Sequence, residues 1–239
     1  TNSTQHPHFI GTIDSWLHGY ILHPFAHKET NFKGKNGNKA FSLLDNSKGL
    51  DFLENKRYNL KYETEVKDKK GQVVIDSASG KPKTRWVPFY ATEFFLSHEG
   101  NPVPNTEDKK LHRNINLQDL VKVKTNFNED GFCTYQDAEH LCYKVLKNNT
   151  SKLDALAKRF PVVIVDECQD LSQNQLRTFH LLIEKGVKIF LIGDVNQSIY
   201  EFRRVDIVKI NAFIKYHKLE QKLLTKNFRS NQKVVNVSI

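Results

Sequence analysis

The sequence lacks methionine altogether and has only three cysteines among its 239 residues. Cys133, Cys142 and Cys168 are scattered and form no CxxC pair, which excludes a disulfide framework and a zinc site. This usage favours a reducing compartment, so we expect a cytoplasmic protein. No apolar run approaches the roughly 18 to 20 residues that a membrane-spanning helix needs, so we expect no membrane partner. The absence of an initiator methionine predicts an interior fragment of a larger protein.

The composition excludes disorder and favours a polyanionic partner. Hydrophobic residues make up 38% of the chain and aromatic residues 11%, enough to build a core. The formal net charge is +9, and the surplus is densest between residues 203 and 233, with nine basic and two acidic residues. A phosphate-facing surface explains this density. A solvated helical face is the alternative.

The second half of the chain reads as an α/β arrangement. A helix is predicted over 134–147, with Thr134 as its N-cap, and a second over 151–158. The continuous apolar run at 162–165 is typical of a buried parallel strand. An amphipathic helix over 172–185 and a second apolar strand follow it. Strand, helix and strand in this order predict a unit of a parallel sheet.

The first half gives weaker signals. A helix is expected within residues 9–26, capped by Asp14 or Ser15 and ended by Pro24. Residues 58–66 and 72–76 are β-like and are expected to pair as a hairpin. No chemical motif occurs in this middle region.

Two adjacent carboxylates follow the first apolar strand. Burying charge is costly unless it is paired or bound to a cation, so Asp166 and Glu167 at this position are unexpected for a structural strand. Ligands of open α/β sheets bind at the carboxyl ends of strands. Asp166 can hold Mg²⁺ there, and Glu167 can polarise an attacking water. A solvated acidic turn is the alternative interpretation.

Polar residues also follow the next strand, which ends at Asp194. Gln197 can hydrogen-bond a terminal phosphate or the attacking water without adding charge. Tyr200, Phe202 and Arg203 interleave aromatic rings with a guanidinium, which suits stacking on exposed bases and pairing with phosphates. One of the two aromatic residues can instead belong to the core of the next helix.

Three segments together resemble a known family. Asp166–Asp170, Gly193–Arg203 and Asn227–Ser230 resemble motifs II, III and IV of UvrD/Rep-type superfamily 1 DNA helicases, in the same order and spacing. Gly11–Trp16 resembles motif Ib, although Asp14 stands where the family usually has histidine. The N-terminal Phe9–Thr12, with Pro24 and Phe25 further on, is similar to UvrD-like helicases of bacterial phage-defence systems such as Gabija.

The resemblance implies an ATP-dependent DNA helicase with ATP and Mg²⁺ as cofactors. Asp166 would then coordinate Mg²⁺, and Glu167 would activate water. The side chains that would contact or position the nucleotide are Gln169, Gln197, Phe228 and Arg229, and Arg229 would reach the γ-phosphate as a second catalytic residue. Single-stranded or partly duplex DNA is the implied partner. Its expected contacts are Thr12, Ser15, Tyr200, Phe202 and Arg203.

The resemblance also implies a fold: a partial RecA-like P-loop NTPase domain, α/β in class, with an inserted mixed α+β subdomain. Residues 1–27 and 131–239 would belong to RecA-like domain 1A, and 28–130 would form the 1B-like insertion. No GxxxxGK[ST] loop occurs in the sequence. We therefore expect this fragment alone to be inactive. A non-catalytic nucleic-acid-binding module and a different P-loop ATPase are the competing hypotheses.

Overall fold

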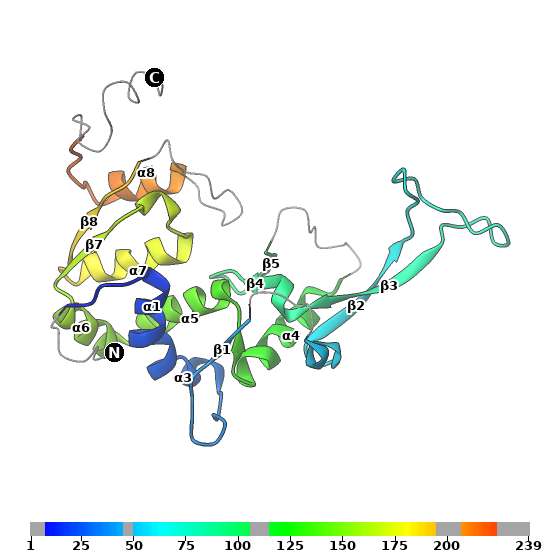
Figure 1. Cartoon of the computed structure of the whole chain (residues 1–239), viewed down its shortest axis with the longest axis horizontal. Helices are drawn as coiled ribbons and strands as arrows, with labels where there is room; N and C mark the ends of the chain where they lie inside the picture. The colour runs from blue at the N-terminus through cyan, green and yellow to red at the C-terminus, as the bar shows by residue number, and fades with distance from the viewer. Residues whose placement is uncertain (1–7, 45–49, 106–114, 195–206, 224–239) are drawn as a thin grey trace, which may run out of the picture.

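The computed structural model describes residues 8–44, 50–105, 115–194 and 207–223. They form two bodies around separate hydrophobic clusters (Figure 1). The main body comprises the described residues of 8–43 and 133–223, and the smaller body those of 44–132. Within the described residues, no helix has both the length and the apolar character needed to cross a membrane.

The N-terminal segment of the main body is helical in four short pieces. Thr12 is the N-cap, and its Oγ1 accepts the Ser15 N–H at 3.1 Å, so the prediction that Asp14 or Ser15 caps this helix was wrong. Pro24 does not end the segment: it lies just beyond a π-helical turn, and Leu22, His23 and Ala26 all keep the right-handed helical conformation. The pieces are α1 (Ile13–Leu17), the π-helical turn η1 (His18–Leu22), α2 (His23–Phe25) and α3 (His27–Thr30).

The rest of the main body confirms most of the predicted elements. Its helices are α5 (Tyr135–Asn148), α6 (Thr150–Arg159), α7 (Gln173–Glu184) and α8 (Ile207–Tyr216). The strands β7 (Val162–Val165) and β8 (Lys188–Leu191) pair in parallel, as strand-helix-strand order predicts. Thr134 caps α5 and Ser172 caps α7, each in a capping box that satisfies exposed N–H groups at the helix start.

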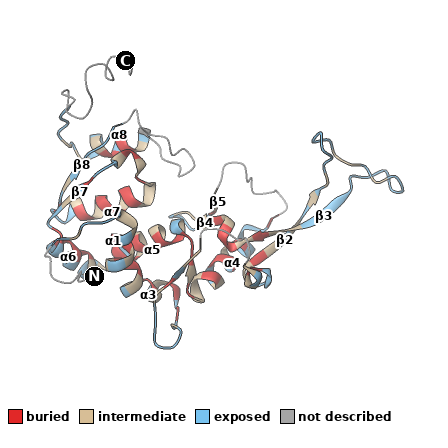
Figure 2. Ribbon diagram, viewed as in Figure 1, coloured by how far each residue is buried: buried red, intermediate tan, exposed pale blue. Residues whose placement is uncertain are grey.

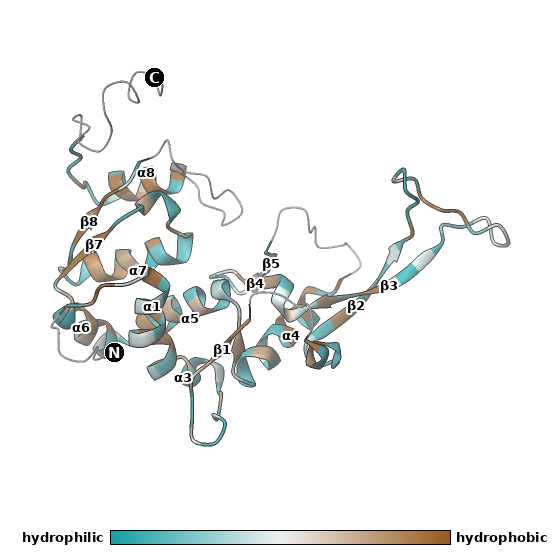
Figure 3. Cartoon of the chain, in the orientation of Figure 1, coloured by the Kyte–Doolittle hydropathy of each residue, from teal (hydrophilic) through white to brown (hydrophobic). Residues whose placement is uncertain are grey.

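Among the described residues, the sheet formed by β7 and β8 is covered on one face only. Val163, Ile189 and Leu191 pack against the core of the main body, which lies on the side of α7. On the opposite face Ile164 is 66% exposed and Phe190 55% exposed. Figure 2 shows exposed stretches along β7 and β8, and Figure 3 shows that these strands are largely hydrophobic. The prediction of strands buried on both faces was therefore wrong for the described residues. The apolar residues on this second face of the sheet contact no other described element.

The smaller body packs one helix against short antiparallel strands. Its helix is α4 (Leu117–Glu129), and a long hairpin extends from it in Figure 1. The hairpin consists of β2 (Asn59–Glu65) paired with β3 (Thr84–Tyr90), so the ladder partner of β2 is not the predicted segment 72–76. That segment does fold back just beyond the end of β2, where Val73 bridges Lys67 and the Val74 N–H donates to the Val66 carbonyl at 2.9 Å. Its remaining elements are η2 (Asp51–Glu54), η3 (Ala91–Glu93) and the antiparallel pair β4 (Phe94–Leu96) and β5 (Pro102–Pro104). At the boundary between the two bodies, β1 (Ser42–Leu43) pairs in parallel with β6 (Phe132–Cys133).

A buried ion pair joins the two bodies. Lys124 of α4 is fully buried, and its Nζ lies 2.8 Å from Asp137 Oδ2 at the start of α5. The same Nζ donates to the Ala91 carbonyl, and Asp137 Oδ2 also accepts the Thr134 N–H at 2.9 Å. Burial lowers the pKa of Lys124, and the charge of Asp137 opposes that shift. The buried Lys124 of the smaller body is therefore paired with the buried Asp137 of the main body.

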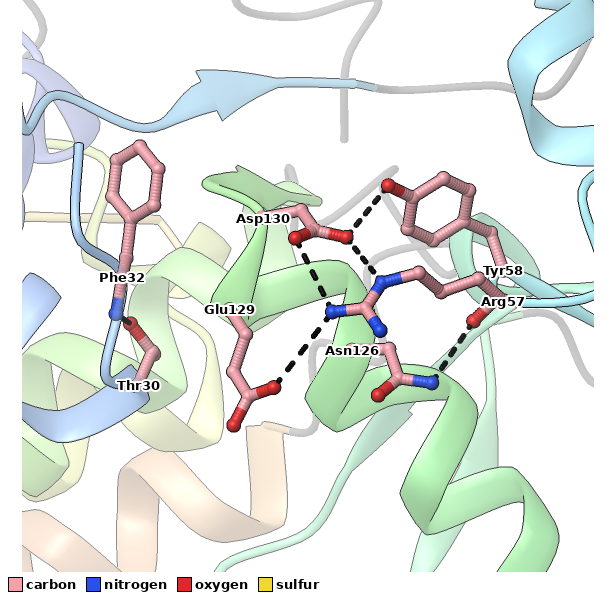
Figure 4. Close-up of polar contacts among 7 residues, drawn as sticks. All are labelled: Thr30, Phe32, Arg57, Tyr58, Asn126, Glu129 and Asp130. Atoms are coloured by element: carbon pink, nitrogen blue, oxygen red, sulfur yellow. Dashed lines mark hydrogen bonds and ion pairs between the residues drawn. The ribbon is translucent and has the colours of Figure 1, made fainter. Parts of the chain in front are cut away.

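A second polar cluster anchors the base of the hairpin (Figure 4). Arg57 Nε donates to Asp130 Oδ2 at 2.6 Å, and the Tyr58 hydroxyl donates to the same oxygen at 2.7 Å. Burial alone would raise the pKa of Asp130, but these two hydrogen bonds hold it below its usual value. Gly131 follows with φ +83°, and a Cβ there would lie 2.3 Å from the Phe32 ring, so only glycine fits this junction.

We expect Asp137→Ala to lower the free energy of unfolding of the chain by about 3–5 kcal/mol, because Lys124 would stay buried without its counter-charge. Chemical denaturation measures the loss. The matched control is Asp154→Ala, which breaks the surface pair with Lys185 at 2.7 Å, where the Asp154 side chain is 45% exposed. This control is expected to cost about 1 kcal/mol or less. Equal losses in the two variants would contradict a special role for the buried pair.

Candidate functional site

The acidic pair lies at the carboxyl end of β7, exposed to solvent. Val165 ends the strand, and Asp166 and Glu167 follow it. Glu167 adopts a left-handed backbone conformation, φ 52° and ψ 45°, and its N–H donates to Asp166 Oδ1 at 2.9 Å. A residue other than glycine pays about 1–2 kcal/mol for this conformation. Such strain concentrates at functional sites, so the geometry supports a functional role for this turn.

A buried glutamine holds Glu167 in place. Gln169 lies in η4 (Cys168–Asp170) and is 3% exposed. Its Nε2 donates to Glu167 Oε2 at 2.6 Å, and its Oε1 accepts the Asp194 N–H at 3.2 Å. The Cys168 N–H donates to the Ile192 carbonyl at 2.9 Å. The ends of β7 and β8 are therefore tied together, and the carboxylate of Glu167 is fixed relative to both.

Gly193 allows Gln169 and Cys168 to lie close to the end of β8. The sequence did not point to this role of Gly193. A Cβ on Gly193 would lie 2.5 Å from Gln169 Oε1 and 2.7 Å from Cys168 Sγ. Both distances are shorter than any real carbon contact, so a side chain would displace Gln169. The glycine after an apolar strand was a signal that could have shown it, because glycine in such a place marks close backbone approach.

The residues expected to contact DNA near the N-terminus lie at the start of α1. Thr12 and Ser15 are exposed, and their hydroxyl oxygens lie 2.7 Å apart. Asp14 accepts a hydrogen bond from Gln175 of α7 at 3.3 Å. Sequence reasoning placed Gln175 only within a helix. Gln175 lies three residues after Ser172, which is the spacing of a capping box. That spacing could have predicted that the Gln175 side chain points back to the start of the helix.

The other predicted site residues lie outside the described residues. These are Gln197, Tyr200, Phe202, Arg203, Phe228 and Arg229. Of the predicted nucleotide site, the structure thus brings together Asp166, Glu167 and Gln169.

The donor set at the end of β7 fits a nucleotide-bound Mg²⁺. In the part of the chain that the structure describes, no group of three or more histidine, cysteine or acidic side chains could hold a metal. Magnesium that accompanies a nucleotide needs only one or two carboxylates, since phosphates and waters complete its octahedron. Asp166 is exposed at the strand end, so it can serve as that carboxylate.

Comparison with known proteins identifies the family. The model of the UvrD/REP helicase N-terminal domain matches residues 6–218. The chain belongs to this family. A related protein, an ATP-dependent helicase/nuclease subunit of Streptococcus pyogenes serotype M5 (strain Manfredo), is 36% identical over 133 residues, 51% of this chain and 11% of the relative. The protein of the same name from serotype M49 (strain NZ131) is 38% identical over 109 residues, 44% of this chain and 9% of the relative.

The part of this UvrD/REP helicase domain that matches them therefore covers about a tenth of the length of each relative. The match confirms the resemblance to UvrD/Rep-type helicases that the motifs indicated. The two streptococcal relatives do not test the narrower resemblance to phage-defence helicases, which stays a prediction.

In this helicase domain, Gly193→Ala is expected to lower the free energy of unfolding by about 1–3 kcal/mol, because the added methyl group overpacks the contact with Gln169 and Cys168. Urea denaturation of the chain measures the change. Gly19→Ala is the control: a Cβ there meets nothing within 4 Å, so no loss is expected. A stable Gly193→Ala variant would show that the turn has more room than these distances allow.

Proposed function

We propose that the protein carrying this chain is an ATP-dependent DNA helicase that couples ATP hydrolysis to movement on single-stranded DNA. The observation that carries the proposal is the exposed pair of carboxylates at the end of a parallel strand, with Glu167 held by a buried glutamine. Family membership supports it, and the relatives from Streptococcus pyogenes are named as ATP-dependent helicase/nuclease subunits.

We assign a separate task to each carboxylate. Asp166 uses Oδ1 to accept the N–H of Glu167, and a carboxylate has further lone pairs for a cation. Bound Mg²⁺ would supply charge neutralisation for the phosphates. Glu167 receives the Gln169 N–H on Oε2, so its second oxygen, Oε1, is the atom that would accept a proton from the attacking water. Gln169 thereby orients the general base.

We further propose that the main body is part of a RecA-like domain 1A and that residues 28–130 form the inserted 1B-like subdomain. The parallel pairing of β7 and β8 supports the first part. The exposed apolar face with Ile164 and Phe190 supports it as well, because parallel sheets are normally covered by helices on both faces. The two separate hydrophobic clusters support the second part.

The DNA contacts remain part of this proposal. Thr12 and Ser15 present hydroxyl groups at the start of α1, where phosphate oxygens can accept hydrogen bonds. The aromatic and basic side chains Tyr200, Phe202 and Arg203 would stack on bases and pair with phosphates. Gln197, Phe228 and Arg229 would complete the nucleotide site.

We expect Glu167→Gln in the full-length protein to reduce DNA-stimulated ATP turnover by about 10²–10⁴-fold, because the amide cannot accept the proton of the attacking water. Magnesium-dependent nucleotide binding should persist, since Asp166 is unchanged. Steady-state ATP hydrolysis and nucleotide-binding titrations provide the two measurements. The control Glu99→Gln removes an exposed carboxylate of the smaller body and should leave turnover unaltered.

Three results would each contradict the proposal or a part of it. Wild-type protein that binds DNA without any magnesium-dependent nucleotide binding would favour a non-catalytic nucleic-acid-binding module. Undiminished turnover in Glu167→Gln would remove Glu167 from the role of general base. Robust hydrolysis by residues 1–239 alone would contradict the expectation that this piece is inactive.

A further inference from the structure

A buried glutamine joins the start of α1 to the segment that follows the acidic pair. Gln175, in the first turn of α7, is 6% exposed. Its Nε2 donates to Asp14 Oδ1 at 3.3 Å and to Glu139 Oε1 at 3.1 Å. Asp14 belongs to α1 and Glu139 to α5, so a single carboxamide connects three helices that are distant in sequence.

The orientation of this carboxamide is determined by its neighbours. Gln175 Oε1 accepts the Ser172 N–H at 3.0 Å, while the Ser172 hydroxyl donates to Glu139 Oε2 at 2.5 Å. A flipped carboxamide would turn its oxygen toward two carboxylates and its NH₂ group toward an N–H donor. Each of these contacts would be repulsive, so Gln175 has one satisfactory orientation.

The same short segment also contains the residue that holds Glu167. Gln169 holds the Glu167 carboxylate at 2.6 Å, and Ser172 lies three residues further along the chain. Leu171, between η4 and the cap of α7, is buried, so the segment has little freedom to move independently. One glutamine therefore positions the proposed general base, and a second positions the helix that presents Thr12 and Ser15.

We propose that Gln175 is a positioning residue that couples DNA binding at the start of α1 to ATP turnover at Glu167. The inference rests on the proposed function. Asp14 supplies one of the two carboxylate acceptors of the Gln175 NH₂ group, and Glu139 supplies the other. A change in the position of α1 upon DNA binding would pass through Gln175 and Ser172 to the turn that carries Gln169 and Glu167.

The test is Gln175→Glu in the full-length protein. The new carboxylate cannot donate to Asp14 or Glu139 and repels both. Basal ATP turnover should stay within about twofold, because Gln169 still holds Glu167, whereas stimulation by single-stranded DNA should fall about tenfold. The matched control is Gln173→Glu, which adds the same charge to the same helical turn and should keep full stimulation.

A reversed network provides the rescue. In the triple variant Asp14→Asn, Glu139→Gln and Gln175→Glu, the two new amides can donate to the new carboxylate. The Ser172 N–H keeps an acceptor at position 175, and the Ser172 hydroxyl keeps one at position 139. Restored stimulation is the expected result. Asp14→Ala offers an independent check, because Asp14 is only partly buried and its loss removes a negative charge near the DNA contacts. It should lose stimulation without weakening DNA binding.

The outcomes separate this inference from the proposed function. Unchanged stimulation in Gln175→Glu, or equal losses of basal and stimulated turnover, overturns the coupling role. If Gln175→Glu does not fold, full stimulation in Asp14→Ala overturns it instead. Wild-type protein that hydrolyses no ATP refutes the proposed function itself.

Discussion

A lysine without access to water needs a counter-charge, and in this chain that requirement joins two separately packed bodies. Lys124 comes from α4 of the smaller body and Asp137 from α5 of the main body. The aromatic rings of Phe94 and Phe127 lie 4.9 and 5.3 Å from the ammonium group and shield it from solvent. The position of α4 relative to α5 follows, because moving either helix would leave a buried charge unpaired.

A second constraint operates where β7 ends. Two carboxylates follow a strand that packs on the core, and they must be solvated or hydrogen-bonded. Both acids are exposed to solvent. Buried Gln169 also donates to Glu167 and accepts the N–H of Asp194 at the end of β8. Gly193 leaves the space that Gln169 occupies. Three residues beyond Gln169 in the chain, Ser172 and Gln175 form a second hydrogen-bonded group, which reaches Asp14 of α1. The candidate catalytic turn and the candidate DNA-contacting helix are therefore connected by a short backbone segment and this hydrogen-bonded group.

Local patterns predicted the second half of the chain well. Thr134 caps α5, and the apolar runs form β7 and β8, since capping and hydrophobic periodicity act over a few residues. Residues 72–76 pair with the chain at Val66 and Lys67, just beyond the end of β2, whereas Thr84–Tyr90 pairs with β2 along its whole length and places Phe89 in the core of the smaller body. The pairing of strands this far apart in the sequence depends on how their side chains pack in the core, which a short sequence pattern cannot predict.

The sequence by itself determined the family and the candidate acids, because motif residues with fixed spacing reflect local chemistry at strand ends. Asp166, Glu167 and Gln169 were found in this way. The tertiary structure decided how these residues are held: the left-handed backbone of Glu167, the space beside Gly193 and the link from Gln175 to Asp14. These contacts join residues up to 161 positions apart, and such pairs arise only when helices pack, so their hydrogen bonds cannot be read from sequence spacing.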